Sequence, residues 1–284
     1  MPLPFNFFGC SSRRPARTAL ATLAAGMLLA LMPARTEAQT VSSLRITGGD
    51  AVTGNWLTFD NGTQDAVLTF VSGSDTEATI AAKVRLRSDL RISHNLAGHT
   101  LTFGTVVQGG NDQVKHDITV EGAGNVAFDQ NIANVDAFTF ASSGNLTFAG
   151  TTTLGSLTLT GGLLELSTSH LTIDTLTITG DTIIDFGTHG ESFIYAGQIT
   201  IAEGATLTIR NWTEATDYFY ASLAPTSANL AAVTFEGHEA GSAWSAYDGQ
   251  ISPFQPVPEP SATGALVLGA ALGAFWLHRR RRRD

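Results

Sequence analysis

The chain has 284 residues, of which 43% are hydrophobic and only 14% are charged, and its formal net charge at pH 7 is −9. This acidic balance opposes binding to nucleic acid or to anionic lipid surfaces. Cys10 is the single cysteine, which excludes an intramolecular disulfide framework. The stability of the fold must therefore come from burial and hydrogen bonding.

Residues 1–38 have the pattern of a secretory signal peptide. Three arginines within the first 17 residues precede an apolar run from Ala19 to Met32, and Thr36-Glu37-Ala38 offers a small-x-small cleavage site. We expect signal peptidase and the secretion machinery to process the chain after Ala38. Twin-arginine export is an alternative for Ser12-Arg13-Arg14, although that signal usually carries apolar or aromatic residues where Pro15-Ala16 stands.

Loss of both ends would change the charge of the remaining body. Cys10 would leave with the signal peptide, so that no thiol nucleophile and no thiolate metal ligand remains. Residues 39–256 hold 22 acidic and seven basic side chains, which gives a net charge of −15. No nucleic-acid partner is expected for such a body.

From residue 39 onward, short runs alternate apolar and polar residues with period two, which is typical of strands with one buried face. Clusters of Gly, Asn, Asp and Ser separate these runs and supply turn conformations. Examples of the runs are Leu57-Thr58-Phe59, Leu101-Thr102-Phe103, Phe138-Thr139-Phe140, Leu146-Thr147-Phe148 and Leu207-Thr208-Ile209. We predict an all-β body of strand repeats over residues 39–210.

Arg85, Arg87 and Arg91 form the main basic cluster of this body. They alternate with Val84, Leu86 and Leu90, so they are interpreted first as the solvent-facing side of strands. Binding of an acidic polysaccharide is the alternative reading of the same cluster.

A seven-residue spacing runs from Ser156 to Gly180, with Leu157, Leu164, Leu171 and Ile178 in phase. A coiled coil is excluded because apolar residues lie two apart within each unit, and Thr, Ile and paired glycines are poor helix formers. Three such units, roughly 20 residues, would form one coil of a solenoid. The predicted fold is a right-handed parallel β-helix, and a β-sandwich is the alternative.

The segment Gly155-Ser156-Leu157-Thr158-Leu159-Thr160-Gly161-Gly162-Leu163-Leu164-Glu165-Leu166 resembles the β-strand repeats of autotransporter passenger domains. That family also carries a long outer-membrane barrel. Residues 211–256 are too few to build one, so self-export through a barrel is not predicted.

Candidates for catalysis and metal binding are sparse. Asp181 and Asp185 lie four residues apart, roughly 13 Å on a strand, which is too far for a paired-carboxylate hydrolase without a turn. His189 and Glu191 follow closely, and a turn-rich chain supplies such acids for backbone reasons. His94 and His99 lack the further ligands that zinc requires. We expect no catalytic residue, no cofactor and no assigned metal site, and calcium binding stays open.

Residues 211–252 are rich in aromatic residues and alanine. A solenoid needs a cap over its last coil, and this segment is predicted to close it. Stacking of sugar rings is the alternative, with Trp212, Trp244 and Tyr247 as the candidate glycan contacts.

Residues 253–284 combine a proline-rich spacer, an apolar stretch and a basic end. Ser261 to Leu277 is an uncharged run of 17 residues, which gives roughly 26 Å of helix against a hydrocarbon thickness of ~30 Å. We predict one transmembrane helix over this run, which is just long enough to span a membrane. The five residues Arg279, Arg280, Arg281, Arg282 and Arg283 should stay cytoplasmic by the positive-inside rule, which places the body on the other side of the membrane.

Pro258-Glu259-Pro260, followed by a short hydrophobic helix and an arginine cluster, resembles the PEP-CTERM sorting signal of Gram-negative bacteria that make extracellular polysaccharide. The resemblance implies recognition by an exosortase, a membrane-embedded cysteine transpeptidase. Val257, Pro258, Glu259 and Pro260 would then form the sorting and cleavage motif. A plain C-terminal membrane anchor with a chance Pro-Glu-Pro linker is the alternative.

Together these features predict a non-enzymatic, structural or adhesive protein of the cell surface or the biofilm matrix. It would be anchored first in the inner membrane and then passed to the outer envelope or the extracellular matrix, with extracellular polysaccharide as a partner. The alternative is a secreted β-helix protein that binds or degrades polysaccharide.

Overall fold

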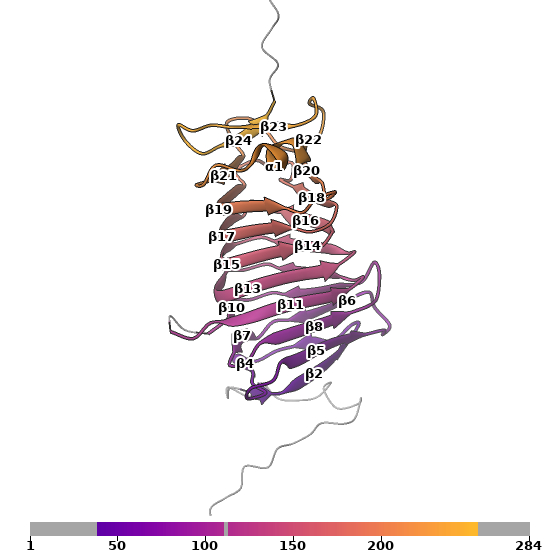
Figure 1. Ribbon diagram of the computed structural model, residues 1–284. Helices are drawn as coiled ribbons and strands as arrows, with labels where there is room; N and C mark the ends of the chain where they lie inside the picture. The colour runs from indigo at the N-terminus through magenta and orange to yellow at the C-terminus, as the bar shows by residue number, and fades with distance from the viewer. Residues whose placement is uncertain (1–38, 111–112, 255–284) are drawn as a thin grey trace, which may run out of the picture. The chain divides into compact units, whose positions relative to one another are not determined.

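The computed structural model describes residues 39–110 and 113–254 and is drawn in Figure 1. Over these residues the protein is a parallel β-solenoid of about eight turns. The strands of its two large sheets pair in parallel throughout, so the predicted β-helix is confirmed and the β-sandwich is wrong. Its right-handed winding stays a prediction.

Each of the first four coils has three sides, which we call side 1, side 2 and side 3. Side 1 is formed by β1 (Gln39–Val41), β4 (Trp56–Phe59), β7 (Lys83–Leu86) and β10 (Val107–Gln108). Side 2 is formed by β2 (Ser43–Thr47), β5 (Ala66–Val71), β8 (Leu90–His94) and β11 (His116–Gly122).

Side 3 runs the whole length of the solenoid as a nine-stranded parallel sheet. Its strands are β3 (Ala51–Val52), β6 (Glu77–Ile80), β9 (Thr100–Phe103), β12 (Asn125–Phe128), β14 (Asn145–Phe148), β16 (Gly162–Leu166), β18 (Thr182–Asp185), β20 (Leu207–Arg210) and β22 (Val233–Phe235).

Sides 1 and 2 merge in the later coils. The long strand β13 (Ile132–Ser142) pairs with β10 through its first residues and with β11 through the rest. Its register shifts between Ile132 and Val135, where Asn134 takes a left-handed φ of 58° and replaces the corner loop of earlier coils. The next strands, β15 (Thr151–Leu159), β17 (His170–Ile178) and β19 (Phe193–Ile201), continue this arrangement.

The core is a stack of inward-facing side chains from all three sides. In β15 and β17 the register pairs Leu157 with Leu176 and Leu159 with Ile178, and these side chains are fully buried. Phe103 and Phe128 stack at 4.7 Å between ring centroids, and Phe148 continues the aromatic column. The seven-residue spacing of the sequence therefore marks successive sides of a coil, as predicted.

The parallel sheets extend beyond Arg210. Strand β21 (Tyr218–Ala221) pairs with the first part of β19, and β22 pairs with β20. Next to them lie the short helix α1 (Ser227–Ala232) and an antiparallel hairpin of β23 (Ser242–Trp244) and β24 (Ile251–Pro253). Both elements contact the last coil, as Figure 1 shows at its orange and yellow end.

No helix within residues 39–110 and 113–254 is long and apolar enough to cross a membrane. The predicted signal peptide, the predicted sorting motif at 257–260, the apolar stretch at 261–277 and the arginines at 279–283 lie outside the described residues.

Candidate functional site

The aromatic residues that the sequence suggests as glycan contacts are not alike. Trp212 is half-buried, and its ring packs edge-on against Phe235 at 5.1 Å between centroids. Trp244 is also half-buried, and its indole Nε1 donates a hydrogen bond of 2.9 Å to the Ala221 carbonyl. Tyr247 is 99% exposed. The two tryptophans therefore contribute to packing at the closing end, and only Tyr247 offers a free ring.

A different group of aromatic residues lies on the outer face of side 1 in the last coils. We call Phe193, Tyr195, Tyr218 and Tyr220 the aromatic cluster. The first two belong to β19 and the others to β21, and the register pairs Phe193 with Tyr218 and Tyr195 with Tyr220. These positions alternate with the buried residues Ile194 and Phe219, so all four rings point outward.

The rings of the aromatic cluster support one another. Phe193 and Tyr218 stack with 5.0 Å between centroids, and Tyr218 stacks on Tyr220 at 5.6 Å with planes only 4° apart. His170 on β17 adds an edge-on contact to Phe193 at 4.6 Å. Tyr195 stays 49% exposed. Stacking fixes the rings of Phe193, Tyr218 and Tyr220 and leaves them partly exposed, which provides an apolar surface for a ligand with C–H groups.

Hydroxyl groups at the edge of the cluster can form hydrogen bonds. The Tyr218 hydroxyl donates to the Ala215 carbonyl at 2.8 Å. Burial raises the pKa of Tyr220, and the nearby Tyr218 and Asp248 raise it further. Tyr220 therefore stays neutral at physiological pH and can donate a hydrogen bond to a hydroxyl or ether oxygen.

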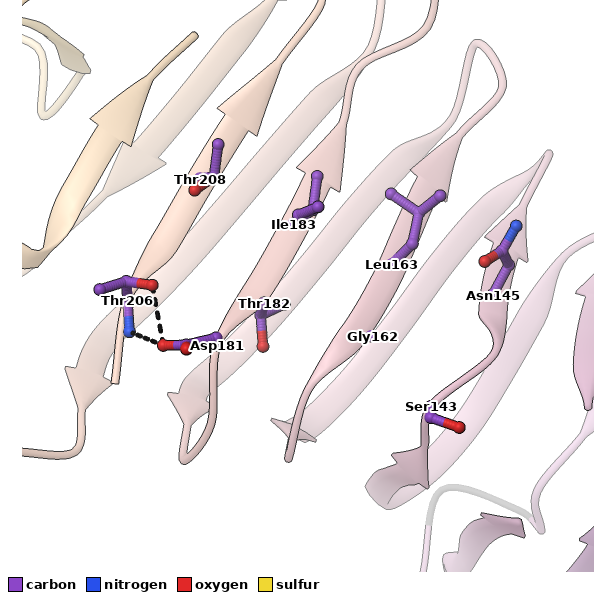
Figure 2. A pocket seen from close by; sticks show the side chains of 9 residues that line it. All are labelled: Ser143, Asn145, Gly162, Leu163, Asp181, Thr182, Ile183, Thr206 and Thr208. Atoms are coloured by element: carbon purple, nitrogen blue, oxygen red, sulfur yellow. Dashed lines mark hydrogen bonds between the residues drawn. The ribbon is translucent and has the colours of Figure 1, made fainter. Parts of the chain in front are cut away.

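An open hollow of about 460 Å³ lies on the outer face of side 3 and is shown in Figure 2. Its floor is a row in which Asn145, Leu163, Ile183 and Thr208 follow one another on β14, β16, β18 and β20. At one end the Asp181 carboxylate accepts hydrogen bonds from the Thr206 amide at 3.0 Å and from its hydroxyl at 2.8 Å. This carboxylate therefore holds the turn before β20 in place.

Asp185 does not share a site with Asp181. The register places it beside Glu165 of the preceding coil, and neighbouring parallel strands lie about 4.8 Å apart. One Asp185 oxygen accepts hydrogen bonds from the Gly187 amide and from the Asn211 side chain, both at 2.8 Å. A second hollow, of about 200 Å³, is lined by Glu165, Asp185 and His189. The sequence pattern pairs Asp181 with Asp185 and gives no sign of Glu165, because only the strand register brings Glu165 close to Asp185.

The basic residues of the sequence cluster have separate surroundings. Arg91 on β8 makes a two-pronged ion pair with Glu121, with nitrogen–oxygen distances of 2.8 and 2.9 Å. Arg85 on β7 lies over the ring of Trp56 instead, with 4.4 Å from its guanidinium carbon to the ring centroid. Lys83 approaches the same ring at 5.8 Å. Both Lys83 and Arg87 are exposed.

His94 and His99 contact each other through a ring nitrogen and a carbonyl oxygen. His94 is fully buried, and its Nε2 lies 3.0 Å from the His99 carbonyl oxygen. Within the part of the chain that the structure describes, no group of three or more His, Cys, Asp or Glu side chains is arranged to hold a metal ion.

No family model, no curated protein and no solved structure matches this chain.

Proposed function

We propose that this chain is an exported, non-enzymatic structural or adhesive protein of the cell surface or extracellular matrix, processed by an exosortase at Val257–Pro260. The structural observation that supports the proposal is a solenoid whose sides present broad strand faces and open hollows. Such faces offer a large area of contact to a partner, as a coat or scaffold requires. The arginines before the first apolar run and after the last one support export of the body between them.

The main experiment measures the intact mass of the protein recovered from the envelope and the medium of cells that naturally produce it. The native chain should lack both ends. A variant with Pro258→Ala, Glu259→Ala and Pro260→Ala should keep its C-terminal segment and stay with the membrane. A variant with Gln255→Ala and Pro256→Ala changes the neighbouring spacer and should be cut normally. An uncut C-terminus in the native chain would contradict exosortase processing.

Polysaccharide binding is the second candidate function, and the aromatic cluster favours it. Aromatic faces complement the C–H faces of sugar rings, and four outward aromatic residues on two adjacent coils form such a surface. The half of the body that carries the cluster, residues 129–254, holds 13 acidic side chains and only Arg210 as a base. A neutral glycan is therefore the expected ligand at this end.

Retention on insoluble cellulose and on xylan tests this second function. Tyr195→Ala with Tyr220→Ala should weaken retention by about tenfold, because stacked aromatic groups contribute roughly 0.5–1.5 kcal/mol each. Tyr247→Ala removes a more exposed ring outside the cluster and should have little effect. Equal losses in both variants would assign retention to general exposure of aromatic groups and would reject the cluster as a site.

A further inference from the structure

Three basic side chains lie in a row at the other end of side 1. Lys83 and Arg85 occupy outward positions of β7, and Arg87 follows directly after the strand. Alternate residues of a strand lie about 6.6 Å apart on the same face. Trp56 on β4 is the register partner of Lys83. We call these four residues the cation patch.

Trp56 fixes the geometry of the cation patch. Its indole ring lies 4.4 Å from the Arg85 guanidinium carbon and 5.8 Å from the Lys83 ammonium nitrogen. Cation–π attraction therefore gathers two positive charges around one ring and reduces the freedom of two long side chains. Ordered in this way, the Arg85 fork can receive a carboxylate through two parallel hydrogen bonds.

The cations of the patch are not neutralised by ion pairs within the described residues. In residues 39–110 and 113–254, Arg91 pairs with Glu121 and Arg210 pairs with Glu236, whereas the three cations of the patch have no ion-pair partner. On the neighbouring coil Asp60 lies beside Arg87, and its Oδ1 accepts a hydrogen bond from the Gly62 amide. Three positive charges thus remain available to an external anion.

The distribution of charge along the solenoid selects the kind of anion. Residues 39–128 hold six basic and nine acidic side chains, a net charge of −3, while residues 129–254 carry −12. A thin chain that crosses the patch meets only charges within a Debye length of about 8 Å. A second copy of this protein would instead bring its whole acidic body close, and the two bodies would repel each other.

We propose that the cation patch binds a linear, carboxylate-bearing polysaccharide, a chain that contains uronic acid residues. Arg85 and Lys83 bind carboxylates of successive sugars, Arg87 extends the row, and the indole of Trp56 both orders the cations and contacts a sugar ring. The inference takes from the proposed function only that the body meets polysaccharide. Binding is measured on purified protein, so its failure is separate from a failure of sorting.

The test is binding of the purified full-length protein to immobilised polygalacturonate, with dextran as the uncharged probe. Lys83→Gln with Arg85→Gln should weaken binding by about tenfold or more, the usual scale for loss of charge-assisted contacts. Arg45→Gln with Arg210→Gln changes the net charge equally, but on sides 2 and 3 and not on side 1, and should weaken it less than about twofold. Arg85→Lys keeps the charge but loses the fork, so it should fall between these values.

Trp56→Ala distinguishes the effect of the ordered geometry of the patch from the effect of its charge alone. It leaves every cation in place, and the proposal expects a loss similar to that of Arg85→Lys. Equal weakening by the two double variants would overturn the proposal, as would dextran binding that Lys83→Gln with Arg85→Gln weakens to the same extent. Displacement of polygalacturonate by inorganic polyphosphate at matched charge concentration would also overturn it, because the patch would then be a general anion site.

Discussion

At the scale of single residues, His94 is the least expected feature of the core. Its ring is fully buried against Phe70, with 4.4 Å between ring centroids. The Nε2 atom donates to the His99 carbonyl, so Nδ1 must be the unprotonated nitrogen, and it has no hydrogen-bond partner. A proton on Nδ1 would be buried without an acceptor. Burial lowers the pKa of His94, and the charge of His99 lowers it further, against the opposing effect of the backbone hydrogen bond.

His94 should therefore make stability depend on pH in a defined direction. The unfolded chain binds a proton near the ordinary value of 6.5, and the folded chain only below it. The contribution of neutral His94 to the free energy of unfolding is fully present above pH 6.5, and it is lost as the pH falls toward the lowered pKa. Urea unfolding at pH 7.5 and 5.0 should show a larger loss for the native chain than for His94→Gln. An equal loss in both chains would assign the acid sensitivity to other groups.

Gly124 provides a second test of the same site. A methyl group at this position would overlap three ring atoms of His94, and the ring is buried and cannot move aside. Gly124→Ala should lower the free energy of unfolding by about 1–3 kcal/mol, the usual cost of overpacking a core. Gly104→Ala is the control, because its new methyl would meet Thr79 at 3.5 Å and the Ile80 carbonyl oxygen at 3.8 Å, which are ordinary contact distances. Urea midpoints that shift equally in both variants would reject a tight contact at Gly124.

At the scale of elements, the helix α1 replaces the missing strand of side 2 in the last coil. Its residue Asn229 donates through Nδ2 to the Ile199 carbonyl at 2.9 Å and accepts through Oδ1 from the Ile201 amide at 3.3 Å. One side-chain amide thus makes both bonds that the next parallel strand would make with β19. The exposed edge of the solenoid is closed by a single residue at this point.

Asn229→Asp is a sharp test of this closure. The new carboxylate can still accept from the Ile201 amide, but it cannot donate to the Ile199 carbonyl and repels it instead. We expect a loss of about 1–3 kcal/mol, with faster amide exchange at the end of β19. Asn55→Asp is the comparison, because it adds the same charge at an exposed side chain that makes no hydrogen bond in the described structure. Unchanged exchange at Ile201 would show that α1 does not protect the edge.

The elements also show which parts of the structure can be predicted from sequence. Alternation with period two identifies inward rows such as Leu157 and Leu159, because each strand has one buried face. The aromatic cluster escaped prediction for the same reason, since Phe193-Ile194-Tyr195 and Tyr218-Phe219-Tyr220 are apolar on both faces and do not alternate. Their contact also depends on a coil length of 25 residues, which turns and loops determine.

The pairing of Glu165 with Asp185 and the merging of sides 1 and 2 in β13 depend on register in the same way. The register between coils depends on the length and conformation of the loops, and no local sequence pattern reveals it. The sequence thus predicts strands, turns and core rows well. It is a poor guide to which outward-facing residues come into contact.

At the scale of the whole body, charge is divided unevenly along the solenoid. The first half, residues 39–128, carries −3 and the second half, residues 129–254, carries −12. Like charges stacked on successive coils repel each other and weaken the folded state. The second half should therefore be the part whose stability responds most to ionic strength.

Salt should stabilise the protein, and the response should belong to the second half. Raising the ionic strength from about 0.01 M to about 0.15 M shortens the Debye length from ~30 Å to ~8 Å and screens the repulsion. We expect a gain of roughly 1 kcal/mol, which corresponds to about 2–4 °C in Tm. At low salt, Glu203→Gln with Glu214→Gln should reproduce much of this gain, because both acids are exposed in the second half. Asp65→Asn with Glu77→Gln removes the same charge from the first half and should stabilise less. A larger gain from the first-half pair would mean that local contacts, and not the uneven field along the solenoid, control the salt response.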